Sequence, residues 1–191
     1  MRIAVFASGS GSNAEAIIQA TKKGMLDAEV ALVVTDKPSA KVVERAKSYG
    51  IDVFAFSPKD FDGKEAFERE IVATLKEFQI SFLVLAGYMR LVGKTLLEAY
   101  EGRMVNIHPS LLPSFPGLDA IGQAFAAKVK ITGVTIHYVD AGMDTGPIIA
   151  QEAVRIDDND TIDTLREKVQ AIEHKLYPET LQTIFMEKGK S

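Results

Sequence analysis

The chain has 191 residues, of which 47% are hydrophobic and 25% charged, and its formal net charge at pH 7 is -4. This length and composition are typical of a soluble globular domain with a sizeable core. The negative charge and scattered basic residues disfavour nucleic acids and membranes as partners, although a local site can still bind a small anion. Cysteine is absent, which excludes disulfides, thiolate metal ligands and a cysteine nucleophile.

The first half of the chain alternates short β-branched runs with longer amphipathic ones. The N-terminal run breaks at Gly9, too early for a secretion signal or membrane span, so the cytoplasm is the expected location. Because apolar strands alternate with helices, we expect a parallel sheet covered on both faces. The predicted strands cover 2–7, 29–36, 51–56, 81–88 and 103–108, and the predicted helices cover 13–23, 39–49, 63–78 and 93–100.

In the second half of the chain, the predicted strands and helices no longer alternate. A helix is expected over 119–129, strands over 132–139 and 147–154, and a long helix over about 160–186. The loop between these two strands, 140–146, is too short for a parallel crossover, so they should form an antiparallel hairpin. The predicted fold is α/β: a single-domain, Rossmann-like, open twisted sheet of about seven strands, mixed but mostly parallel, with helices on both faces.

A glycine-rich turn follows the first predicted strand. "GSGSNA" matches G-x-G-x-x-[GA] at Gly9, Gly11 and Ala14, and Asp36 ends the second strand, which is typical of a dinucleotide site. The same backbone N–H groups and helix N-terminus would bind any small phosphate. A plain strand-to-helix turn, capped by Ser12, is the structural alternative.

The stretch "NIHPSLLPSFPG" begins in the fifth predicted strand. Asn106 and His108 should point to the same side of that strand, with α-carbons roughly 6.5–7 Å apart. An amide and an imidazolium can both donate to one oxygen, as is required when a carbonyl becomes a tetrahedral oxyanion. Pro109, Pro113 and Pro116 would restrict the loop that follows. A buried histidine beside a stiff loop is the alternative.

A second loop, "DAGMDTGP", offers a charge partner. A carboxylate from Asp140 or Asp144 beside His108 would favour the imidazolium, although such aspartates also commonly form turns. His137 is expected to be structural. Gln170 and Glu173 share one face of the last helix and could hold ribose hydroxyls, or simply face solvent. The sequence has no convincing metal-ligand spacing and no G-x-S-x-G motif, which disfavours a metal site and a serine acyl-enzyme.

Five segments together resemble one family over essentially the whole chain: "FASGSGSN", "LAGYMRLV", "NIHPSLLPSFPG", "GVTIHYVDAGMDTGPII" and "EHKLYP". They are similar to the folate-dependent formyltransferases, and in particular to those that act on glycinamide ribonucleotide. The most specific signal is N-x-H-P-S-L-L-P followed by D-x-G-x-D-x-G-P.

The resemblance implies transfer of a formyl group from 10-formyltetrahydrofolate to the amine of N1-(5-phospho-D-ribosyl)glycinamide, in de novo purine biosynthesis. The amine would attack the formyl carbon directly, with 10-formyltetrahydrofolate as cosubstrate and without a metal. The implied partners are these two small molecules, with no nucleic acid or membrane, and the chain would be a monomer or homodimer.

The resemblance also implies roles for individual residues. Residues 1–100 would form the phosphate-binding half of a single domain covering 1–191, and 101–191 the catalytic and folate-binding half. The implied catalytic residues are Asn106, His108 and Asp144; the ribonucleotide site comprises Gly11, Ser12, Asn13, Gln170 and Glu173; and the folate site comprises Lys64, Met89, Arg90, Leu91, Val92, Asn106 and Asp140.

One position departs from the pattern, because some relatives carry histidine where this chain has Asp119. Two rivals in the family, methionyl-tRNA formyltransferase and formyltetrahydrofolate deformylase, resemble this domain joined to a further one, so the chain length disfavours them. A nicotinamide-dependent oxidoreductase would explain Gly9, Gly11 and Asp36 but would leave His108 without a role. A catalytically silent nucleotide-binding module is the remaining alternative.

Overall fold

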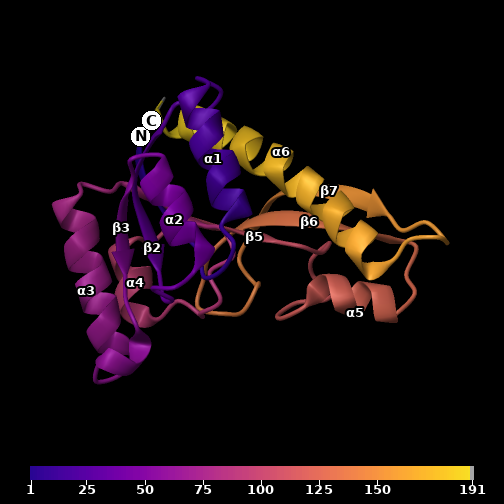
Figure 1. Ribbon diagram of the computed structural model, residues 1–191, viewed down its shortest axis with the longest axis horizontal. Helices are drawn as coiled ribbons and strands as arrows, with labels where there is room; N and C mark the ends of the chain where they lie inside the picture. The colour runs from indigo at the N-terminus through magenta and orange to yellow at the C-terminus, as the bar shows by residue number, and fades with distance from the viewer. Residues whose placement is uncertain (190–191) are drawn as a thin grey trace.

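In the computed structural model, which describes residues 1–189, seven strands form one sheet in the order β3-β2-β1-β4-β5-β6-β7 (Figure 1). The pairs among the first five strands are parallel, whereas β6 is antiparallel to both β5 and β7. The predicted mixed sheet with a C-terminal hairpin is therefore confirmed. The strands are β1 (Arg2–Phe6), β2 (Glu29–Thr35), β3 (Asp52–Ala55), β4 (Phe82–Leu85), β5 (Met104–His108), β6 (Ile131–Tyr138) and β7 (Ile148–Arg155).

Helices cover both faces of this sheet. One face carries α1 (Ser12–Lys22), α2 (Lys41–Ser48), α5 (Ala120–Ala126) and α6 (Ile162–Lys188), and the other carries α3 (Lys64–Glu77) and α4 (Lys94–Ala99) (Figure 1). A short 3-10 helix, η1 (Pro58–Asp60), was not expected from the sequence. No helix within residues 1–189 is long and apolar enough to cross a membrane.

The alternation of side chains along β1 explains why the core has two layers. Ile3 and Val5 belong to the buried cluster beneath α1 and α6, whereas Ala4 and Phe6 belong to the cluster beneath α3 and α4. Successive side chains of a strand point to opposite faces, so a strand covered on both sides must be apolar throughout. The central strands therefore form a rigid support for the loops at their ends.

Helix α6 crosses the sheet and is anchored in its middle. It begins with a capping box between Thr161 and Thr164. The fully buried Tyr177 donates its hydroxyl to the carbonyl of Leu85, 2.8 Å away, with the carbonyl of Val105 at 3.2 Å. This anchor places the first half of α6 beside the carboxyl ends of β4 and β5.

The chain reverses direction across the sheet between β1 and β4, because β2 lies on one side of β1 and β4 on the other. Loops leaving two such strands diverge and open a crevice at their carboxyl ends. The loops that follow β1, β4, β5 and β6 all come to this part of the molecule, so the topology brings every segment with candidate chemistry to one place.

Candidate active site

A cavity of about 450 Å³ opens at this crevice. It contains twelve of the fourteen residues that the sequence analysis singled out for a site; the two exceptions are Lys64 and Gln170. The lining comes from residues 9–13, 85–92, 106–109, 117–121, 137, 139–140 and 142–144, together with Arg166 and Glu173 of α6.

The two exceptions lie immediately beside the cavity. Lys64 lines a neighbouring hollow that shares Met89, Arg90 and Leu91 with the main cavity. Gln170 donates its side-chain amide to the Ser12 hydroxyl across 2.9 Å. Both residues therefore lie next to the cavity, although neither forms part of its wall.

The glycine-rich turn presents backbone rather than side chains to the cavity. Gly11 has a φ of 75°, and a Cβ atom there would approach the Val42 side chain to 2.6 Å, so only glycine fits. No side chain caps α1, which makes the capped-turn interpretation of Ser12 wrong. The first N–H groups of α1 are thus left for an anion, which the positive end of the helix dipole also favours.

Side chains of α6 reach over this turn. Asn13 donates its amide to the Glu173 carboxyl across 3.2 Å, while the other amide atom, Oδ1, is buried without a partner. Burial raises the pKa of Glu173 from 4.5 to about 7, and the hydrogen bond from Asn13 partly opposes this. Glu173 therefore lies at the cavity wall as a carboxyl group that can change its protonation near neutral pH.

Asp36, the acidic residue of the apparent dinucleotide motif, is occupied by contacts within the protein. Asp36 is buried and accepts hydrogen bonds from the Ser8 hydroxyl, at 2.5 Å, and from Arg90 Nε, at 2.8 Å. Ser8 in turn accepts the backbone N–H of Met89. Asp36 holds the 86–93 loop in place and is not free to bind a ribose, so the geometry does not support a nicotinamide site.

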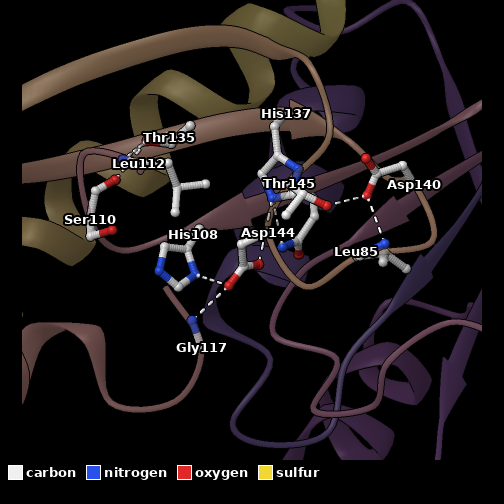
Figure 2. A network of polar contacts seen from close by, with 12 residues as sticks. Leu85, His108, Ser110, Leu112, Gly117, Thr135, His137, Asp140, Asp144 and Thr145 are labelled. Atoms are coloured by element: carbon white, nitrogen blue, oxygen red, sulfur yellow. Dashed lines mark hydrogen bonds and ion pairs between the residues drawn. The ribbon is translucent and has the colours of Figure 1, made fainter. Parts of the chain in front are cut away.

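His108 is held at the end of β5, where it is 5% exposed. Its Nε2 lies 2.8 Å from the carbonyl oxygen of Phe115, which can only accept, so this nitrogen donates. Its Nδ1 lies 3.4 Å from Asp144 Oδ2, longer than an ordinary hydrogen bond (Figure 2). Nδ1 is consequently the nitrogen left for a reacting group in the cavity.

Asp144 connects three segments that are distant in sequence. Its Oδ2 accepts the backbone N–H of Gly117 at 2.8 Å, and its Oδ1 lies 3.7 Å from His137 Nε2 (Figure 2). Asp140, by contrast, accepts bonds from the Gly142 N–H and the Thr145 hydroxyl within its own loop. Asp140 therefore shapes the loop, and Asp144 joins it to the histidine loop.

His137 has a closer connection to the site than the sequence indicated. It pairs with Asn106 across β5 and β6, and its Nε2 lies 3.2 Å from Asn106 Nδ2. Burial lowers the pKa of His137, so its Nδ1–H donates to the Tyr138 carbonyl and Nε2 accepts from the amide. Both ring nitrogens are satisfied, as expected for a structural histidine, yet the ring also orients Asn106.

The loop that follows His108 is held by more than its prolines. Thr135 is fully buried and donates its hydroxyl to the Ser110 carbonyl at 2.6 Å. The Thr135 hydroxyl oxygen accepts the Leu112 N–H (Figure 2). It also accepts the Gln151 side-chain amide. Sequence reasoning missed this connection. The only signal was that Thr135 and His137 share one face of β6.

The described residues 1–189 contain no group of three or more His, Asp or Glu side chains placed to hold a metal ion. The side chains that line the cavity supply amide, imidazole, carboxyl and guanidinium groups beside an unsatisfied helix N-terminus. This combination suits an anionic ligand next to a reaction in which an oxygen gains charge.

Comparisons with known proteins agree with this geometry. Residues 1–181 match the family model described as formyl transferase. The chain is 55% identical to the phosphoribosylglycinamide formyltransferase of Bacillus subtilis (strain 168), over 96% of this chain and 94% of that protein.

Solved structures extend the likeness to the fold. The phosphoribosylglycinamide formyltransferase from Bacillus halodurans is 68% identical, with a TM-score of 0.94 over 96% of this chain and 95% of that one. The glycinamide ribonucleotide transformylase 1 from Geobacillus kaustophilus is 59% identical, also with a TM-score of 0.94, over 96% and 97% of the two chains. Because the family model matches residues 1–181 and these relatives are so similar in sequence and fold, the chain belongs to the formyl transferase family.

Proposed function

We propose that this chain transfers the formyl group of 10-formyltetrahydrofolate to the amine of N1-(5-phospho-D-ribosyl)glycinamide, a step of de novo purine biosynthesis. The observation that carries the proposal is one continuous cavity that joins the glycine-rich turn to Asn106, His108 and Asp144. A single cavity can hold a phosphorylated amine and a formyl donor in contact, which direct transfer requires. The names of the similar proteins support the same reaction.

The ribonucleotide would lie over the glycine-rich turn. The free N–H groups at the start of α1, from Gly11 to Asn13, suit its phosphate. Glu173 contacts Asn13 and lines the cavity, which supports a role for its carboxyl group in binding the ribose hydroxyls. This arrangement directs the glycinamide end of the molecule toward Asn106 and His108.

The folate would lie against the apolar side of the cavity. Four large hydrophobic side chains that are exposed to solvent, an unusual situation, gather around its rim: Met89, Leu91, Leu118 and Met143. The sequence analysis assigned only the first two to this site. An aromatic ring system would cover these side chains, and Lys64 in the adjoining hollow would attract the carboxylates at the other end of the folate.

In the proposed reaction, the formyl carbon exchanges one nitrogen for another, while one proton moves and the formyl oxygen gains negative charge. The glycinamide nitrogen forms a bond to the formyl carbon, the bond from that carbon to folate N10 breaks, and N10 gains the proton that the amine loses. During the step the formyl oxygen carries negative charge, which the second amide hydrogen of Asn106 and His108 Nδ1–H would stabilise. Asp144 would hold the imidazole in place and favour its donation.

The same proposal covers the organisation of the chain. We place the whole reaction in one domain, with 1–100 as the phosphate-binding half and 101–191 as the catalytic half. The cavity takes residues from both, since Met89, Arg90 and His108 all line it. Neither half should therefore work alone. The cytoplasmic location and the monomeric or homodimeric state stay predictions.

A spectroscopic assay tests the function. The purified chain is mixed with 10-formyltetrahydrofolate, with and without glycinamide ribonucleotide, and the folate absorbance is followed. Loss that requires the ribonucleotide is the expected result. Loss without the amine would indicate a deformylase, and no loss under either condition would contradict formyl transfer altogether.

A further inference from the structure

Arg166 lies on the same face of α6 as the two residues that reach the glycine-rich turn. Gln170 contacts Ser12 and Glu173 contacts Asn13. Positions 166, 170 and 173 follow helical spacing, so their side chains are neighbours, and Arg166 is one turn, or ~6 Å along the axis, before Gln170. Arg166 lines the cavity, and it belongs to none of the sequence motifs that carry the proposed function.

Apart from the two histidines, the described residues that line this cavity include only two basic side chains, Arg90 and Arg166. Arg90 is committed to the buried Asp36 at 2.8 Å. Arg166 is 51% exposed, and its partners are the exposed carboxylates of Asp163, at 3.3 Å, and Asp119, at 3.9 Å. Surface pairs of this length are weak and exchange easily. Arg166 is therefore the cation that can change partner when a ligand arrives.

The carboxyl groups that line the cavity would repel an anionic ligand, so a nearby cation is needed to bind one. Asp119, Asp140, Asp144 and Glu173 all line it, and the whole chain carries a formal net charge of -4. A phosphate dianion would meet this field with only the partial positive charge of the α1 N-terminus to attract it. A guanidinium presents paired N–H donors whose geometry matches phosphate oxygens.

The position of the Asp119 side chain does not depend on its ion pair with Arg166. Its carboxyl group accepts the Gly122 N–H and caps α5, which is a local hydrogen bond. Release of the arginine would leave this cap intact, so the exchange of partners carries little structural cost. The ion pair between Asp119 and Arg166 is thus the arrangement that the Arg166 side chain takes when no ligand is bound.

We infer that Arg166 leaves Asp119 and Asp163 to bind the phosphate of the acceptor, and that it thereby sets the preference for a phosphorylated amine. This inference rests on the proposed function, because it assumes that the phosphate lies at the start of α1. Arg166 acts on binding only and takes no part in the transfer of the formyl group.

Three variants test the inference: Arg166→Gln, the conservative Arg166→Lys, and a control, Arg155→Gln, which removes an arginine that is 85% exposed on β7. Steady-state kinetics are measured with glycinamide ribonucleotide and with the phosphate-free ribosylglycinamide. Arg166→Gln should raise KM for the ribonucleotide about tenfold while kcat and KM for the folate change less than about twofold, as loss of one charged hydrogen-bond donor implies. Arg166→Lys should recover part of the loss, and Arg155→Gln should match the parent chain.

The phosphate-free acceptor supplies the decisive comparison, because Arg166→Gln should not change its KM. An unchanged KM for the ribonucleotide, or an equal rise for both acceptors, would overturn the inference. Calorimetric titration with ribose 5-phosphate separates this failure from failure of the proposed function. If the chain transfers no formyl group, weaker binding of ribose 5-phosphate to Arg166→Gln still supports the role of Arg166, and equal binding still contradicts it.

Discussion

The two ends of the cavity are built in different ways. One end, which we propose holds the ribonucleotide and call the ribonucleotide end, comprises Gly11–Asn13, Gln170 and Glu173. It consists of a local backbone turn with two helix side chains above it. The histidine end comprises Asn106, His108, His137 and Asp144, which come from two strands and a loop and lie in a buried network. One end depends on backbone conformation, and the other on side chains that hold each other.

This difference predicts what substitutions will do at each end. A backbone N–H group cannot be removed by changing a side chain, so changes at the ribonucleotide end should mainly affect affinity. At the histidine end each side chain is both a chemical group and a partner of its neighbours. Changes there should affect turnover, and changes in the supporting network should also affect stability.

The largest effect is expected at the histidine end. Asn106→Ala and His108→Ala should each lower kcat by ~10²–10³, the usual loss for a donor to a developing oxyanion. Single-turnover rates with saturating substrates measure this directly, and circular dichroism should show an unchanged fold. Near-normal turnover in either variant would remove these two residues from the proposed chemistry.

At the ribonucleotide end, the raised pKa of Glu173 predicts that the free energy of unfolding depends on pH. Its pKa in the folded chain, about 7, lies above its ordinary value of 4.5. Folding therefore favours the protonated form, and stability is lost as the pH rises between these two values. Glu173→Gln removes this penalty, so the variant should gain about 3 kcal/mol relative to the parent chain between pH 4.5 and pH 8.

Urea denaturation of both proteins across this pH range measures the difference. Asn13→Ala is measured alongside these two proteins. Loss of the amide that donates to Glu173 should raise the pKa of this carboxyl group further. A difference between the parent chain and Glu173→Gln that does not vary with pH would contradict the assignment.

A smaller loss of stability should follow from breaking the support of the histidine end. Thr135→Val leaves the Ser110 carbonyl and the buried Leu112 N–H without their partner and should cost about 1–2 kcal/mol of unfolding free energy. The matched control is Thr132→Val on the same strand, because the buried Thr132 hydroxyl has no partner. Equal effects of the two substitutions would show that the network contributes nothing.

The smallest effect is expected from Ser12→Ala. The Ser12 hydroxyl accepts a hydrogen bond from Gln170 at a partly exposed position and does not cap α1. Stability should change by less than about 0.5 kcal/mol, and KM for the ribonucleotide by no more than about threefold. A loss of affinity comparable to that of Arg166→Gln would mean that the hydroxyl, rather than the backbone, holds the phosphate.

Much of the fold and half of the site could be predicted from local patterns. The apolar run through Ile3 and Phe6 indicated a strand buried on both faces, and the short 140–146 loop left a hairpin as the only pairing. The alternation of Asn106 and His108 placed both at one cavity wall. These inferences depend on chain geometry over a few residues, which tertiary contacts rarely override.

The partners of those residues could not be predicted in the same way. The closeness of His137 to Asn106 follows from the register between β5 and β6, and a shift by one residue would turn the ring away. Asp36 ends a strand exactly as a ribose-binding residue would, but packing brings Ser8 and Arg90 to its carboxylate instead.

By itself, the sequence determined the order of strands and helices, the glycine turn and the spacing of Asn106 and His108, because backbone sterics and side-chain alternation act between near neighbours. Only the tertiary structure decided that Asp144 faces His108, that Thr135 supports the proline-rich loop, and that Arg166 lines the same cavity as His108. Such contacts join residues far apart along the chain, and their geometry depends on how the whole sheet and α6 pack together.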